Sequence, residues 1–126
     1  MATDSPSQPR LALPAPKPDQ PFIETSALEA GILQLIHTRF MAGSKPGEST
    51  MCPSLAFLLC HSVSKESLIF DLGIRKDLAS HPPAVQKITA NRTIVTPQSV
   101  EESLLKGGLD PANVKTVIVS HLHYDQ

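Results

Sequence analysis

The sequence has no tryptophan, one tyrosine and two cysteines among its 126 residues. The sequence has eleven basic and twelve acidic residues, so neither sign of charge dominates. Because no basic stripe or aromatic platform is present, we do not expect a nucleic-acid partner. Cys52 and Cys60 are eight residues apart. That spacing suits neither a zinc ribbon nor a disulfide framework, and it predicts two reduced thiols.

Long apolar runs are also missing. The longest, LAFLLC at residues 55–60, is too short to span a bilayer. The N-terminus lacks the charged start and apolar stretch of a signal peptide. We therefore expect no membrane partner and a cytoplasmic location.

Proline is concentrated at the N-terminus. Residues 1–21 hold six of the twelve prolines and few periodic apolar residues. Such a composition cannot bury enough apolar surface to offset the entropy of ordering the chain. It predicts a disordered proline-rich arm over residues 1–24, followed by a folded domain over residues 25–126.

The first half of the domain is expected to consist mainly of strands. Apolar runs of strand length, separated by segments rich in glycine, serine and proline, predict a hairpin. The expected segments are a helical turn at 26–31, a strand at 32–40, a loop at 41–53, hairpin strands at 54–62 and 67–73, and a short helix from Pro82 or Pro83.

A second helix has clearer signals. Ser99 is followed three residues later by Glu102, which is a capping-box pattern, and Gly107 or Gly108 can close the helix. The β-branched segment 114–120 then predicts a buried strand. Strands followed by a helix and a further strand indicate an α/β fold.

Two histidines and an aspartate follow that last strand at alternate positions: His121, His123 and Asp125. Alternate side chains of an extended chain point the same way. Imidazole and carboxylate are ligands that zinc, iron and manganese accept in catalytic sites. We interpret the pattern as part of a metal site, and the alternative is a polar strand end with solvated histidines. The other histidines have no spacing that recommends them as ligands: His37, His61 and His81.

This H-x-H-x-D pattern after an apolar strand resembles the metallo-β-lactamase superfamily, whose signature is H-x-H-x-D-H. That family also places D-x-G after an earlier hairpin strand, and LIFDLG supplies Asp71 and Gly73. The segment VEESLLKGGLDPANVKTVIVSHLHYD resembles the helix, turn and strand that lead into the family motif. FDLGIRKD followed by HPPA resembles the lactonase branch most. The resemblance covers about residues 30–126.

The resemblance implies a four-layer αββα sandwich, of which this sequence supplies the N-terminal half. It implies that His121 and His123 hold a first metal, and that Asp125 holds a second and acts as the catalytic carboxylate. Asp71 would support the site without binding metal, although an Asp-x-Gly turn that merely closes a strand is an equal alternative. Members of the family hydrolyse esters, lactones, thioesters or β-lactams by means of a hydroxide bound to zinc, with iron or manganese as alternatives.

Two departures from the family pattern bear on activity. Gln126 stands where the family has a histidine, and its neutral amide is a poorer zinc ligand. The family also takes a histidine and a bridging aspartate from beyond the motif. We therefore expect a hydrolase fragment, inactive alone, for a small ester, lactone or thioester. The alternatives are a non-catalytic half-domain or interaction fragment that binds metal weakly, and a mononuclear iron site formed by His121, His123 and Asp125. We also expect an exposed sheet through which the chain can self-associate.

Overall fold

The computed structural model describes residues 13–124. Over this range the chain forms a five-stranded mixed sheet with the strand order β4-β1-β2-β3-β5, accompanied by two short α-helices. The predicted α/β class is confirmed. No helix in the described range is long and apolar enough to cross a membrane.

The strands and helices alternate along the second half of the chain. In chain order they are β1 Ile23–Ile36, β2 Ser49–His61, β3 Ser67–Phe70, α1 Pro83–Thr89, β4 Ile94–Val95, α2 Val100–Lys106 and β5 Thr116–Ile118, with 3₁₀ turns at His37–Arg39, Leu78–Ser80 and Pro111–Asn113.

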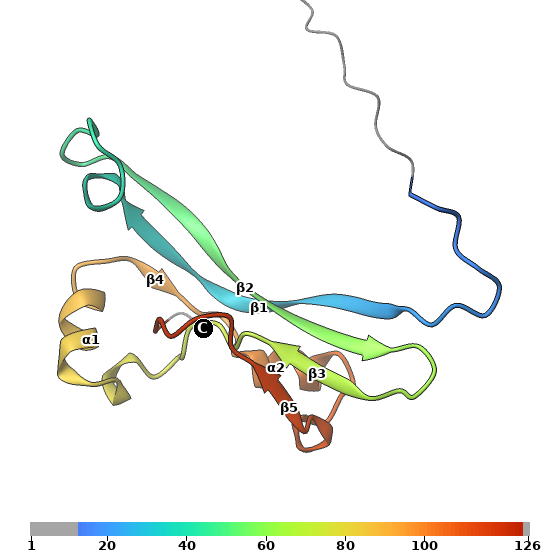
Figure 1. Ribbon diagram of the computed structural model, residues 1–126. Helices are drawn as coiled ribbons and strands as arrows, with labels where there is room; N and C mark the ends of the chain where they lie inside the picture. The colour runs from blue at the N-terminus through green and yellow to red at the C-terminus, as the bar shows by residue number, and fades with distance from the viewer. Residues whose placement is uncertain (1–12, 125–126) are drawn as a thin grey trace, which may run out of the picture.

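Strands β1 and β2 form a long antiparallel hairpin (Figure 1). The predicted helical turn at 26–31 is wrong, because this segment belongs to β1. Leu28 and Ala30 turn inward as in a strand, but at the bulge between Glu29 and Ile32 the adjacent Gly31 is also buried, and the next buried side chain is that of Leu33. The bulge breaks the period-two pattern that would have indicated a strand.

The predicted loop at 41–53 is too long, because β2 begins at Ser49. Glycine, serine and proline dominate this segment and hide the strand. Pro53 pairs with Ile32 beside the β1 bulge. Proline is tolerated at bulges because the ladder there does not need its missing N–H.

Strand β1 begins inside the 1–24 segment that was predicted to be a disordered arm. Ile23 and Glu24 pair with His61 and Cys60 of β2, so the strand starts two residues before the predicted boundary. Residues 13–22 are exposed and form no strand or helix. Residues 1–12 of the predicted arm lie outside the described range.

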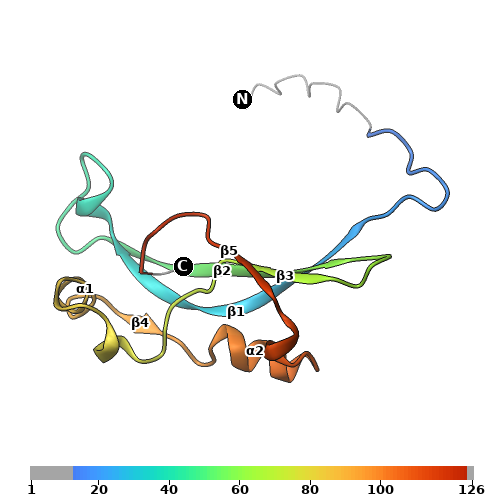
Figure 2. The same cartoon turned by 60° about the horizontal axis from the view of Figure 1, so that its bottom comes forward.

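Helices α1 and α2 lie on the same side of the long hairpin (Figure 2). Helix α2 packs two buried side chains, Val100 and Leu104, against the sheet. The buried sheet residues in this cluster are Ala30, Ala56 and Ile69. This small apolar cluster is the core of the described chain, and its removal from water is the main favourable term in folding.

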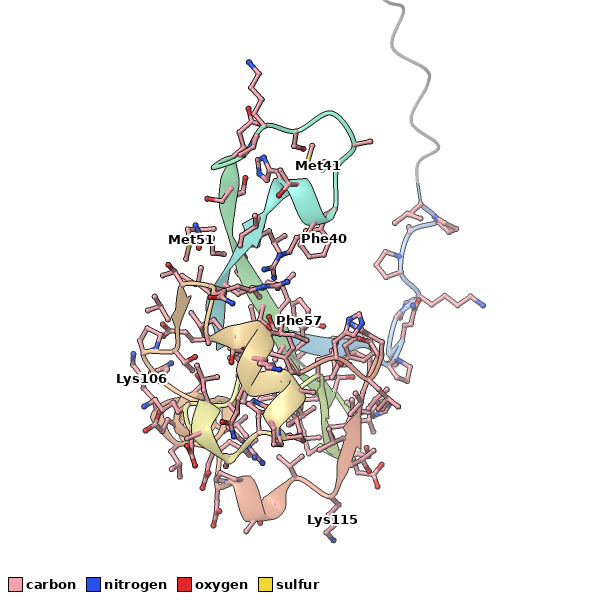
Figure 3. The ribbon with its side chains drawn as sticks, turned by 90° about the vertical axis from the view of Figure 1, so that its left-hand side faces the viewer. Phe40, Met41, Met51, Phe57, Lys106 and Lys115 are labelled. Carbon is pink, nitrogen blue, oxygen red and sulfur yellow. The ribbon has the colours of Figure 1, made fainter. Side chains whose placement is uncertain are left out.

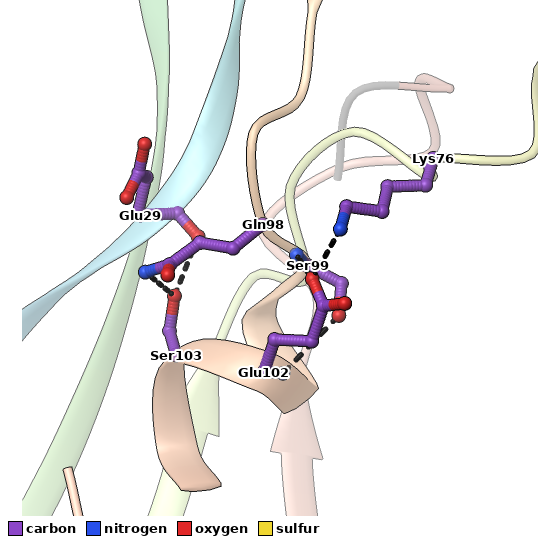
Figure 4. Close-up of polar contacts among 6 residues, drawn as sticks. All are labelled: Glu29, Lys76, Gln98, Ser99, Glu102 and Ser103. Carbon is purple, nitrogen blue, oxygen red and sulfur yellow. Dashed lines mark hydrogen bonds and ion pairs between the residues drawn. The ribbon is translucent and has the colours of Figure 1, made fainter. Parts of the chain in front are cut away.

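The predicted capping box of α2 is confirmed (Figure 4). The Ser99 hydroxyl accepts a hydrogen bond from Glu102 N at 3.2 Å, and Ser99 N donates to the Glu102 carboxylate at 2.7 Å. The Lys76 ammonium beside Glu102, together with the Ser99 N–H, lowers the pKa of that carboxyl below its ordinary value. The helix ends at Gly107, and Gly108 adopts the left-handed conformation, with φ 83°.

Strand β5 pairs with β3 in parallel and forms one edge of the sheet. It is shorter than the predicted 114–120 strand and it is not buried: Val117 and Ile118 are each 44% exposed. The sequence pattern was that of a fully covered strand, but β5 is covered only in part. Its apolar β-branched side chains therefore remain partly exposed to solvent.

The segment after β3 lies very close to β1. Gly73 has φ 69°, and a Cβ added there would lie 2.4 Å from the Ala30 Cβ and 2.5 Å from the Ala30 carbonyl oxygen. The next residue, Ile74, donates its N–H to that same carbonyl at 2.8 Å. Glycine is thus required both for the left-handed backbone and for the close approach.

We expect Gly73→Ala to destabilise the fold more than Gly43→Ala. Both positions are left-handed, but a Cβ at Gly43 would meet nothing within 4 Å. The backbone cost is about 1–2 kcal/mol at either site, and the overlap with Ala30 adds about 1–3 kcal/mol at Gly73. Urea denaturation of both variants measures the difference. Equal losses of stability would show that close packing against Ala30 is not a constraint.

Candidate metal centre

Asp71 joins the end of β3 to the end of β5. Its side chain is buried, and its N–H donates to the Ile118 carbonyl at 2.8 Å. One carboxylate oxygen, Oδ1, accepts a hydrogen bond from Ser120 N at 2.7 Å. The residue is left-handed, with φ 63°, a conformation that aspartate tolerates better than most residues. Asp71 therefore fixes the backbone of the residue that immediately precedes His121.

His121 and His123 come together just beyond this contact. Their ring centroids are 4.6 Å apart and the ring planes are nearly perpendicular. Zinc–nitrogen bonds are about 2.0–2.1 Å long, so two rings at this separation can reach one ion. Both side chains are exposed, so an ion can enter from solvent.

A hydrogen bond to Ser120 orients one of the two rings. The Ser120 hydroxyl lies 2.9 Å from His121 Nδ1. If Nδ1–H donates to this hydroxyl, Nε2 carries the lone pair that a metal needs. Metal-binding histidines commonly have such a partner on the other ring nitrogen. In that tautomer, Nε2 of His121 is free to accept an ion.

The described residues contribute only two candidate ligands, His121 and His123. Asp125, the predicted ligand of a second ion, and Gln126 lie outside the described range. Between residues 13 and 124, no three His, Cys, Asp or Glu side chains are grouped so that they could hold an ion. The two imidazoles fit a nitrogen-preferring ion such as zinc, but a catalytic zinc usually has three protein ligands.

The side chains of two other histidines form hydrogen bonds within the β-hairpins. His37 Nε2 lies 2.7 Å from the Thr50 hydroxyl, near the end of the β1–β2 hairpin. His61 Nδ1 accepts hydrogen bonds from the N–H groups of Val63 and Ser64 in the turn between β2 and β3. These contacts give both residues a structural role in the hairpins, and their exclusion as ligands stays a prediction.

A cavity of about 890 Å³ adjoins the candidate site. His123 and Tyr124 contribute to its wall, together with His81 from the segment before α1. The rest of the wall is largely apolar, and includes Leu72, Ile74 and Leu122. A largely apolar cavity with a few polar groups is typical of small-molecule sites.

Sequence reasoning missed that His81 and Tyr124 face one cavity. His81 lies 43 residues before Tyr124, and their rings meet edge to edge with centroids 6.3 Å apart. For Tyr124 there was one available signal, namely its place inside the H-x-H-x-D pattern. For His81 there was none, because its position depends on how the segment after Gly73 crosses the sheet.

Two curated proteins are similar in sequence. The chain is 36% identical over 78 residues to the metallo-hydrolase mfmC of Annulohypoxylon moriforme, a match that covers 58% of this chain and 20% of that protein. It is 29% identical over 115 residues to the cytochrome P450 monooxygenase mpaDE of Penicillium roqueforti (strain FM164), covering 86% of this chain and 13% of that protein. The chain thus spans a fifth or less of these relatives. No protein-family model matches it.

Solved lactonases share the fold. A quorum-quenching N-acyl homoserine lactone lactonase matches with a TM-score of 0.59 and 22% identity, over 81% of this chain and 38% of that one. An N-acyl homoserine lactone hydrolase, with N-hexanoyl-L-homoserine bound at its catalytic metal centre, matches with a TM-score of 0.62 and 18% identity, over 81% and 42% of the two chains.

These likenesses identify the fold as the N-terminal part of the metallo-β-lactamase fold, in the form that lactonases have. The resemblance that rested on H-x-H-x-D and D-x-G is confirmed, and the sequence relative named as a metallo-hydrolase agrees with it.

Proposed function

We propose that this chain forms part of a metal-dependent hydrolase in which His121 and His123 bind the first ion. The observation that carries the proposal is the double contact of Asp71 with Ile118 and Ser120. This contact holds the strand end at the point where the two imidazole rings converge. A sequence relative named as a metallo-hydrolase supports the same reaction class.

Zinc is the proposed ion, since the described donors are both imidazole nitrogens; iron and manganese accept the same donors. A bound zinc ion would polarise a carbonyl and lower the pKa of a coordinated water. Asp125 is proposed to bind a second ion and to act as the catalytic carboxylate. Asp71 acts on the backbone only, and its buried carboxylate would keep the two histidines in place for the ion.

The proposed substrate is a small ester, lactone or thioester. One structural relative contains N-hexanoyl-L-homoserine, which is an acyl compound, at its metal centre. In this chain the largely apolar cavity next to His123 suits an acyl chain, which would contact Leu72, Ile74 and Leu122. The carbonyl would then lie near the imidazole of His123.

We expect the 126-residue chain to bind zinc weakly and to hydrolyse neither lactones nor thioesters by itself. Two described ligands are fewer than a catalytic zinc needs, and ordering the segment around an ion costs about 1–2 kcal/mol per residue. Calorimetric titration with zinc measures the binding. It should disappear in the double variant His121→Ala/His123→Ala and persist in the control His37→Ala.

Hydrolysis assays with the same variants test the expected lack of lactone and thioester hydrolysis. Zinc-dependent turnover by the 126-residue chain that is abolished by His123→Ala would contradict the expected inactivity. Zinc binding that survives the loss of both histidines would contradict the proposed site itself.

Self-association is a second proposal, and the exposure of β5 favours it. Strand β5 is at the edge of the sheet and exposes Ile118, with Val119 beside it. An open edge with apolar side chains is a surface on which another chain can add a strand.

We expect sedimentation velocity to show oligomers on the order of tens of micromolar, the scale at which exposed strand edges associate. Ile118→Lys should shift the chain toward monomer, because a charged edge residue opposes pairing. Leu13→Lys is the control, since Leu13 is 91% exposed and lies outside the sheet. A wild-type chain that stays monomeric would rule out association through this edge.

A further inference from the structure

Tyr124 anchors the segment that contains the two histidines. Residues 115–123 are all exposed, whereas the side chain of Tyr124 is half-buried. The backbone contacts of Asp71 end at Ser120. Tyr124 is therefore the next described point at which side-chain burial holds this segment to the rest of the protein.

Arg92 forms a hydrogen bond with the hydroxyl of Tyr124. Its Nη1 donates a hydrogen bond to Tyr124 Oη at 3.1 Å. The two residues are 32 positions apart, and Arg92 lies in the connection between α1 and β4. The ring of His81 packs edge-on against the same tyrosine. Tyr124 is thus fixed at its hydroxyl by one residue and at its ring by another.

The guanidinium of Arg92 is itself held in place. It lies over the ring of Phe40, with its central carbon 5.6 Å from the ring centroid, a geometry in which the cation is attracted to the ring. Phe40 lies near the end of the β1–β2 hairpin (Figure 3). The Arg92 Nε is buried without a hydrogen-bond partner among the described residues.

We propose that Arg92 is a positioning residue of the candidate metal centre, which acts on His123 through Tyr124. The inference rests on the proposed function and adds a residue to its site. His123 directly precedes Tyr124, and both line the same cavity. A held tyrosine restricts the backbone of its neighbour before an ion arrives, which reduces the entropy that metal binding must offset.

The sequence provides a direct probe of this contact. Tyr124 is the single tyrosine of the chain and there is no tryptophan, so tyrosine fluorescence reports on Tyr124 alone. In the metal-free protein, acrylamide should quench this fluorescence more efficiently in Arg92→Met than in wild type. Arg92→Met keeps the aliphatic length of the side chain and removes the donor. Arg39→Met is the matched control, because Arg39 is exposed.

Zinc affinity tests whether the anchor serves the metal site. We expect Arg92→Met to weaken zinc binding about tenfold, the usual scale for residues that orient metal ligands. Tyr124→Phe keeps the ring against His81 and removes the hydroxyl, so it should cause the same loss. Both substitutions remove the same hydrogen bond between Arg92 and Tyr124. The double variant should therefore bind zinc no more weakly than either single variant. Calorimetry on all three variants measures this.

The outcomes separate the inference from the proposed function. If wild-type protein binds zinc and both single variants bind it equally well, Arg92 does not position the site. Losses that multiply in the double variant would also overturn the inference, because the two residues would then act independently. If the Arg92→Met variant does not fold, the zinc affinity of Tyr124→Phe tests the inference by itself. A wild-type chain that binds no zinc would instead overturn the proposed function.

Discussion

The hydrogen bond from Ser120 N to the Asp71 carboxylate is the contact on which the candidate metal centre depends. Strand β5 is short, exposed and paired on one side only, so it cannot hold its own end in place. Asp71 continues the β3–β5 ladder by one backbone and one side-chain hydrogen bond. The two histidines begin where this ladder ends, and for that reason their rings converge instead of dispersing into solvent.

Asp71 is itself held by the packing of the residues that follow it. Gly73 lies against Ala30, and Ile74 is hydrogen-bonded to the same residue. Lys76 then pairs with Glu102 in the first turn of α2 (Figure 4). The D-x-G segment is thus fixed to β1 on one side and to a helix on the other. Its backbone conformation would be strained in isolation, and this packing stabilises it.

Local patterns in the sequence predicted the local structure. The capping box of α2, the β2–β3 hairpin and the α1 start at Pro83 all depend on residues close in sequence, and all are observed. The first half of β1 was missed because the bulge around Gly31 interrupts its alternation. The exposure of β5 and the contact between Arg92 and Tyr124 could not be predicted, since both depend on which distant segments pack together.

The central claim is that the Asp71 carboxylate fixes the backbone next to the two histidines. Hydrogen exchange of the Ser120 amide in Asp71→Gly and Asp71→Asn tests it most directly. Glycine adopts the left-handed conformation without strain, so Asp71→Gly removes only the carboxylate, while asparagine keeps an acceptor at Oδ1. We predict that Ser120 loses its protection in Asp71→Gly and keeps most of it in Asp71→Asn. A Ser120 amide that exchanges as slowly in Asp71→Gly as in wild type would contradict this account.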